Sequence, residues 1–173
     1  MIQTLKKLIP TTILYVQIWE NRIKVTDVKS KNIFDDAPLM AIEHTPKNQL
    51  VVIEVGAGSK KHSASPNTVV INPFEHPRTI LSDFQVAEKL LQYAIKTLLK
   101  DKFFAPSPKV VIHPMEKTEG GLTQVEGRAL RELGLSTGAQ DVALCTGAEK
   151  AINDLNFDAI RSDETNLIAM IWT

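Results

Sequence analysis

Lys109-Val-Val-Ile112, Thr123-Gln-Val-Glu-Gly-Arg-Ala-Leu130 and Asp141-Val-Ala-Leu144 follow one another in the chain. The first and third stretches are short and apolar, which indicates buried strands. The middle stretch predicts a helix that continues to residue 135, with four residues expected on its inner face: Val125, Ala129, Leu130 and Leu133. Because strands joined through a helix run parallel, this unit predicts an α/β fold with a parallel part to its sheet.

Upstream of this unit, residues 13–18 and 22–28 flank a short polar turn and predict a β-hairpin. A third strand is expected to run from residue 33 to residue 42, with an edge or a break at Pro38, which has no N–H to donate. Ser82-Asp-Phe-Gln85 has the form of a capping box, and the helix after it has one apolar face formed by Phe84, Ala87, Leu90, Leu91, Ala94, Ile95 and Leu98.

The segments at the two ends and in the middle of the chain complete the expected organisation. Residues 1–12 are expected to form an N-terminal amphipathic tail, and residues 13–42 and 82–173 the main α/β subdomain. Residues 43–81 are rich in proline and polar loops and predict a small inserted lobe. Near the C-terminus, the pattern predicts a short helix over 147–155 and a buried strand over 166–173.

Composition excludes several classes of function. The 173 residues include 20 basic and 20 acidic side chains, so no net charge attracts nucleic acid. One cysteine, Cys145, excludes an internal disulfide and is consistent with the reducing cytoplasm. The histidines have no spacing typical of metal ligands, and no metal or other cofactor is expected: they are His44, His62, His76 and His113.

Several segments together resemble a known family. Phe104-Ala-Pro-Ser-Pro-Lys-Val-Val-Ile112, the helix-like stretch 123–130, Thr137-Gly-Ala-Gln-Asp-Val142 and Asp83-Phe-Gln-Val-Ala-Glu-Lys-Leu-Leu91 are similar in order and spacing to segments of MreB, the bacterial actin that organises rod-shaped growth. The resemblance implies a ribonuclease H-like actin fold. It also implies a single half of that fold, domain I with its small lobe, because the family binds ATP between two halves and this sequence stops at Thr173.

The same resemblance implies that nucleotide chemistry is lost. The family's first phosphate loop, "D-L-G-T", falls on Gln17, Ile18, Trp19 and Glu20, so bulk and negative charge stand where a phosphate needs small residues. Its "E-E-P" segment aligns with Cys145-Thr-Gly147, with Glu149 two residues on. The second loop, "D-I-G-G-G-T", would begin at Met170, Ile171, Trp172 and Thr173. We therefore expect a pseudo-ATPase with no nucleotide site.

Two functions follow from this resemblance. The first is a non-catalytic interaction or regulatory module that binds full-length MreB or another cell-shape protein. The alternative is a small-molecule or nucleotide-binding protein that reuses the cleft near Met115-Glu-Lys-Thr-Glu-Gly-Gly121, an insertion relative to the family. A plain solvated loop is the competing interpretation of that insertion.

Two terminal segments carry further expectations. Ile2, Leu5, Leu8 and Ile9 would share one face of an N-terminal helix, beside Lys6 and Lys7, and family members with such a helix contact the inner membrane. A frayed tail is the alternative interpretation. The apolar strand expected over 166–173 predicts a homodimer, because an uncovered strand recruits a partner.

Overall fold

The computed structural model describes residues 11–47, 49–101 and 106–171, with side chains as far as Glu164. The membrane-contact residues expected near the N-terminus, 2–9, lie outside this range. Within it, no helix is both long and apolar enough to cross a membrane.

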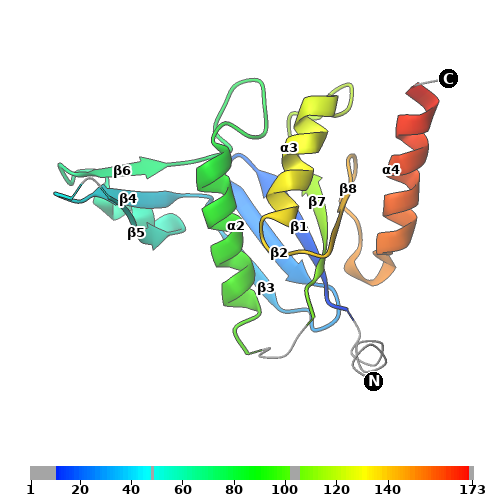
Figure 1. Cartoon of the computed structure of the whole chain (residues 1–173), viewed down its shortest axis with the longest axis horizontal. Helices are drawn as coiled ribbons and strands as arrows, with labels where there is room; N and C mark the ends of the chain where they lie inside the picture. The colour runs from blue at the N-terminus through cyan, green and yellow to red at the C-terminus, as the bar shows by residue number, and fades with distance from the viewer. Residues whose placement is uncertain (1–10, 48, 102–105, 172–173) are drawn as a thin grey trace.

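A five-stranded sheet forms the centre of the molecule, in the order β3-β2-β1-β7-β8 (Figure 1). Its strands are β1 (Ile13–Trp19), β2 (Arg22–Asp27), β3 (Ile33–Asp36), β7 (Lys109–Pro114) and β8 (Asp141–Leu144). The first three are antiparallel neighbours, whereas β7 runs parallel to both β1 and β8. The predicted hairpin and the predicted parallel strands are therefore confirmed.

Alternating side chains of the central strands form two cores, one on each face of the sheet. On one face, α2 (Phe84–Leu98) lies against β2 and β3, and α3 (Gln124–Leu135) lies against β7 and β8. These helices bury Leu90, Leu91, Leu130 and Leu133. On the other face, Tyr15 and Val111 pack with Phe157, at the start of α4 (Phe157–Ile171). Figure 1 shows α4 beside β8, the outer strand of the sheet.

A second, three-stranded sheet forms the small lobe, in the order β5-β4-β6. Its strands are β4 (Met40–His44), β5 (Leu50–Val55) and β6 (Thr68–Ile71), and the 3₁₀ helix η1 (Ala57–His62) packs on them. The strand expected over 33–42 is thus two strands in two sheets, broken around Pro38. The lobe boundary expected at residue 43 falls inside β4.

The starts of α2 and α3 were predicted to within one residue. The cap of α2 is Asp83, whose carboxylate accepts a hydrogen bond from the Val86 N–H at 3.0 Å, whereas the Ser82 hydroxyl donates to the Pro73 carbonyl at 2.9 Å. The helix α3 begins with a capping box between Thr123 and Glu126. Val125 was predicted to face inward but is 78% exposed, because the helix meets the sheet through residues further round its axis.

The C-terminal prediction was wrong. Residues 147–155 form a loop with a single 3₁₀ turn, η2 (Ile152–Asp154), and residues 166–171 are the last turns of α4 rather than a strand. A short apolar run fits a strand or a helix equally well, and here no glycine or proline separates it from the helix that starts at Phe157. The strand-mediated homodimer expected through 166–173 therefore has no strand within 166–171 to form it.

Candidate functional site

The residues aligned with the first phosphate loop form the end of β1 and a tight turn. Trp19 pairs with Arg22 across the hairpin, so Glu20 and Asn21 alone form the turn. The Arg22 guanidinium lies 5.2 Å from the centre of the Trp19 ring and covers it. A phosphate cradle requires several backbone N–H groups pointing into one concavity. A two-residue turn closed by a ladder pair does not present them.

Protein groups contact the backbone N–H, the backbone carbonyl and the carboxylate of Glu20. Its backbone N–H donates to a carboxylate oxygen of Glu116 at 2.8 Å, and its carbonyl accepts from the Asn72 side chain at 2.7 Å. Its carboxylate lies 2.5 Å from the ammonium group of Lys117. Glu116 thus supplies an anion to the turn where a phosphate oxygen would be the ligand. Both charged partners come from the inserted loop 115–121, which folds over this turn.

Gln17, the first residue aligned with the phosphate loop, makes a second contact with a carboxylate. Gln17 is fully buried in β1, and its side-chain amide donates to Glu149 at 2.8 Å. Lys24 lies 4.0 Å from the same carboxylate. The amide N–H group explains this pairing, because an aspartate at position 17 would place two negative charges together. The carbonyl oxygen of the Gln17 side chain has no hydrogen-bond partner in the described part of the chain.

A buried hydrogen-bond chain holds the loop that carries Glu149. The Gly147 carbonyl can only accept, so His113 Nε2 donates to it at 3.1 Å and His113 Nδ1 accepts from the Tyr15 hydroxyl at 2.6 Å. The Lys150 N–H donates in turn to the Tyr15 oxygen at 3.2 Å. Burial raises the pKa of Tyr15 to about 12, so the hydroxyl stays protonated. Loop 147–150 is therefore tied to the interior of β1 and β7.

The hydrogen-bond chain through His113 predicts that the protein loses stability in mild acid. Burial lowers the pKa of His113, against a smaller opposite effect of the Gly147 carbonyl, while the charge of Lys150 lowers it further and Glu149 acts against it. The folded state thus holds this proton more weakly than the unfolded chain, where the pKa is about 6.5. The free energy of unfolding should fall as the pH drops through that value towards the folded pKa.

Urea unfolding at several pH values measures this loss, with His113→Gln and the exposed His44→Gln as a matched pair. We expect the His113 variant to show a flatter pH profile than wild type and the His44 variant to keep the wild-type slope. Identical slopes in all three proteins would contradict the assignment to His113.

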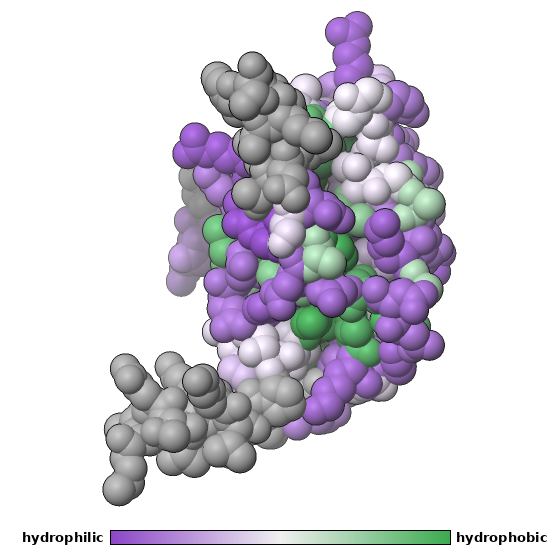
Figure 2. Space-filling model, turned by 90° about the vertical axis from the view of Figure 1, so that its right-hand side faces the viewer, coloured by the Kyte–Doolittle hydropathy of each residue, from purple (hydrophilic) through white to green (hydrophobic). Residues whose placement is uncertain are grey.

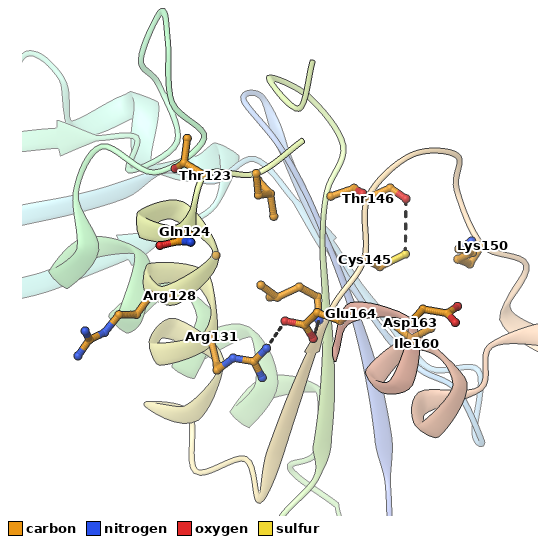
Figure 3. Close-up of a pocket in the computed structure, with 13 residues that line it drawn as sticks. Thr123, Gln124, Arg128, Arg131, Cys145, Thr146, Lys150, Ile160, Asp163 and Glu164 are labelled. Atoms are coloured by element: carbon orange, nitrogen blue, oxygen red, sulfur yellow. Dashed lines mark hydrogen bonds and ion pairs between the residues drawn. The ribbon is translucent and has the colours of Figure 1, made fainter. Parts of the chain in front are cut away.

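A separate pocket of about 590 Å³ lies between α3, β8 and α4 (Figure 3). On the side of the molecule seen in Figure 2, apolar surface is exposed among hydrophilic residues. Figure 3 shows Arg131 of α3 and Glu164 of α4 pointing towards one another, and they form an ion pair. The lining residues are Leu122, Thr123, Gln124, Gly127, Arg128, Arg131, Leu144, Cys145, Thr146, Lys150, Ile160, Asp163 and Glu164.

The Arg131–Glu164 pair covers the free edge of β8. Arg131 donates to the Val142 carbonyl at 2.5 Å, and the Leu144 N–H donates to Glu164 at 3.1 Å. These are backbone groups that a neighbouring strand would otherwise bind. Burial raises the pKa of the Cys145 thiol in the pocket wall, so it is not a reactive thiolate. This pocket was not predicted from the sequence, because no helix was predicted over residues 157–165, which contribute Ile160, Asp163 and Glu164 to one wall.

The remaining predicted site positions do not form a phosphate loop. Met170 and Ile171 lie in the last turn of α4, and residues 172–173 lie outside the described range. Loop 115–121 contributes no residue to the pocket wall, and Leu122 is the first lining residue in chain order. No group of three or more histidine, cysteine or acidic side chains is placed to hold a metal ion within the described residues.

Solved structures with a similar fold define the class of protein. MreB5 of Spiroplasma citri bound to ADP superposes with a TM-score of 0.61 at 15% identity, over 79% of this chain and 38% of that one. A MamK double helical filament gives a TM-score of 0.57 at 12% identity, over 80% and 41%. The chain therefore has an actin-like α/β fold that corresponds to part of those proteins, as the sequence predicted.

Sequence comparison then gives the family. The family model described as MreB/Mbl protein matches residues 22–167, so the chain belongs to the MreB/Mbl family. Over 65 residues it is 42% identical to the cell shape-determining protein MreB of Pasteurella multocida, and over 78 residues 38% identical to that of Escherichia coli K12. These matches cover 38% and 45% of this chain, but only 17% and 21% of those relatives.

Proposed function

We propose that this protein is a member of the MreB/Mbl family that does not hydrolyse ATP and acts through protein contacts in bacterial cell-shape organisation. Its relatives named above are cell shape-determining proteins. The proposed partner is full-length MreB or another cell-shape component, met in the cytoplasm. One observation carries the proposal: the phosphate-loop position is filled by Glu116, Lys117 and Glu149.

The energetic argument follows from these contacts. A triphosphate entering at Glu20 would have to displace the Glu116 carboxylate and would then lie beside Glu20 and Glu149. Like charges at close range repel, and displacement of Glu116 breaks its hydrogen bond to the Glu20 N–H. The cations described at this turn are already paired: Lys117 with Glu20, Lys24 with Glu149 and Arg22 with Asp35.

Thermal shift and phosphate release with Mg²⁺-ATP test the catalytic part of the proposal. We expect no rise in the melting temperature and no phosphate above the protein-free rate, because a ligand stabilises a protein only by binding its folded state. Full-length MreB serves as the positive control. A concentration-dependent rise in melting temperature, or turnover by the purified chain, would overturn the proposal. To test the proposed partner, co-sedimentation with MreB filaments should show association or a change in polymer mass. The absence of both effects would refute that partner.

The pocket between α3 and α4 favours a second candidate function, a small-molecule binder. Its volume of about 590 Å³ falls within the range typical of ligand sites, about 300–1,000 Å³. Leu144 and Ile160 give it apolar walls, and Lys150 and Thr146 give it polar ones. A metabolite that raises the melting temperature of wild type, but not of Ile160→Trp, would favour this function.

A further inference from the structure

The outer strand of the small lobe, β5, is exposed to solvent over residues 50–53. Four consecutive apolar residues are exposed: Leu50 by 65%, Val51 by 42%, Val52 by 44% and Ile53 by 38%. Because neighbouring side chains of a strand point to opposite faces, both faces of β5 are apolar. An outer strand of this kind is a template for another strand.

The contrast with β8 is informative, since both are outer strands. Side chains of Arg131 and Glu164 bind the free backbone groups of β8. Within the described part of the chain, no side chain makes a hydrogen bond to the backbone of residues 50–53. The edge of β8 is thus capped by its own protein, whereas that of β5 is available to another chain.

A groove of about 250 Å³ lies beside β5, and its lining indicates the charge that a bound partner would carry. Figure 1 shows the lobe projecting from the body next to α2. The groove is lined by Met40, Val52 and Val55 from the lobe and by Lys89, Gln92, Tyr93 and Lys96 from α2. Residues 89, 93 and 96 recur at helical spacing on one face of α2. The groove therefore has an apolar floor and two cations on one wall.

Among the described residues, no acidic side chain pairs with these cations. None of the lining residues is acidic, and neither Lys89 nor Lys96 forms an ion pair with any described residue. Glu54, the carboxylate within β5, is held by Lys61 and His62 at 2.7 Å each. Gln92 donates to the Ser136 carbonyl, so it is not a free polar group.

We propose that this groove binds an extended acidic segment of a partner protein, which adds to β5 as a further strand. Apolar side chains of the segment pack on Val52 and Tyr93, and its carboxylates meet Lys89 and Lys96. Strand addition supplies main-chain hydrogen bonds, and the side chains supply specificity. This deepens the proposed role as an interaction module, but the groove shares no lining residue with the turn at Glu20, and the two are tested separately.

Fluorescence anisotropy with a labelled eight-residue peptide of alternating valine and glutamate tests the proposal. The control peptide has lysine in place of glutamate. The test variant is Lys89→Glu/Lys96→Glu, and the matched control is Lys29→Glu/Lys60→Glu, two exposed lysines outside the groove with the same total change in charge. Val52→Lys removes the apolar floor, and circular dichroism confirms that each variant is folded.

We expect wild type and the control variant to bind the acidic peptide, more weakly at high salt, and not the lysine peptide. The Lys89→Glu/Lys96→Glu variant should bind it about tenfold or more weakly, and Val52→Lys should lose binding. Equal binding by both lysine variants, or no binding by wild type, would overturn the proposal. A dimer in analytical ultracentrifugation that Val52→Lys dissociates would also overturn it, because the occupant is then a second copy. None of these outcomes depends on ATP binding.

Discussion

Replacing Gly134 by valine should lower the free energy of unfolding by about 3 kcal/mol, through overpacking between α3 and the sheet. A Cβ atom at this position would lie 2.8 and 2.9 Å from the two methyl carbons of Val142 and 3.1 Å from the terminal carbon of Ile112. Both neighbours are completely buried, so neither can move aside without disturbing the core. The helix would have to lift from β7 and β8.

Urea unfolding followed by circular dichroism measures this effect, and the same helix offers a control. A Cβ atom at Gly127 would meet only the Leu144 side chain, at 3.6 Å, which is ordinary contact. Gly127→Ala should therefore be neutral or stabilise the protein by up to about 1 kcal/mol, as alanine favours helix more than glycine. Equal unfolding midpoints for Gly134→Val and wild type would show that α3 packs less closely than described.

Replacing Glu164 by alanine should cost about 2 kcal/mol of stability. The Glu164 side chain is 11% exposed and binds both the Arg131 guanidinium and the Leu144 N–H. Its removal leaves a cation and a backbone donor without their partner at the edge of β8. Glu164→Gln keeps an acceptor for Leu144 and should cost less.

The exposed ion pair on the same helix as Arg131 provides the comparison. Arg128 and Glu132 are 82% and 55% exposed, and Glu132→Ala should change the unfolding free energy by less than about 0.5 kcal/mol. Both variants are measured by the same urea titration. If Glu164→Ala were no more destabilising than Glu132→Ala, the capping of β8 would not contribute to stability.

Local sequence patterns were enough to predict the central sheet. The β-hairpin, the parallel strands and the start of α3 depend on contacts between nearby residues or on short periodic patterns. The family resemblance also predicted that an altered phosphate loop falls at residues 17–20. Each of these features depends on residues that are close together in the chain, so it can be predicted from a single sequence.

Features that depend on distant contacts were not predictable in the same way. The apolar run 166–171 is compatible with either structure, and the assignment of α4 requires knowing what it packs against. The contact of Glu20 with Glu116 joins residues 96 positions apart, and that of Gln17 with Glu149 joins residues 132 apart. Neither pairing has a local signature, so the sequence predicted a poor phosphate site but not the groups that fill it.

Under the proposed function, nucleotide binding at Glu20 would require coordinated change in the three chain segments that meet there. Aspartate restored at position 17 alone would confront the Glu149 carboxylate, and threonine restored at position 20 alone would deprive Lys117 of its counterion. Glycine at position 19 would open the backbone while Glu116 still held the turn. Each single substitution is thus penalised by residues elsewhere, which is the behaviour of an epistatic barrier.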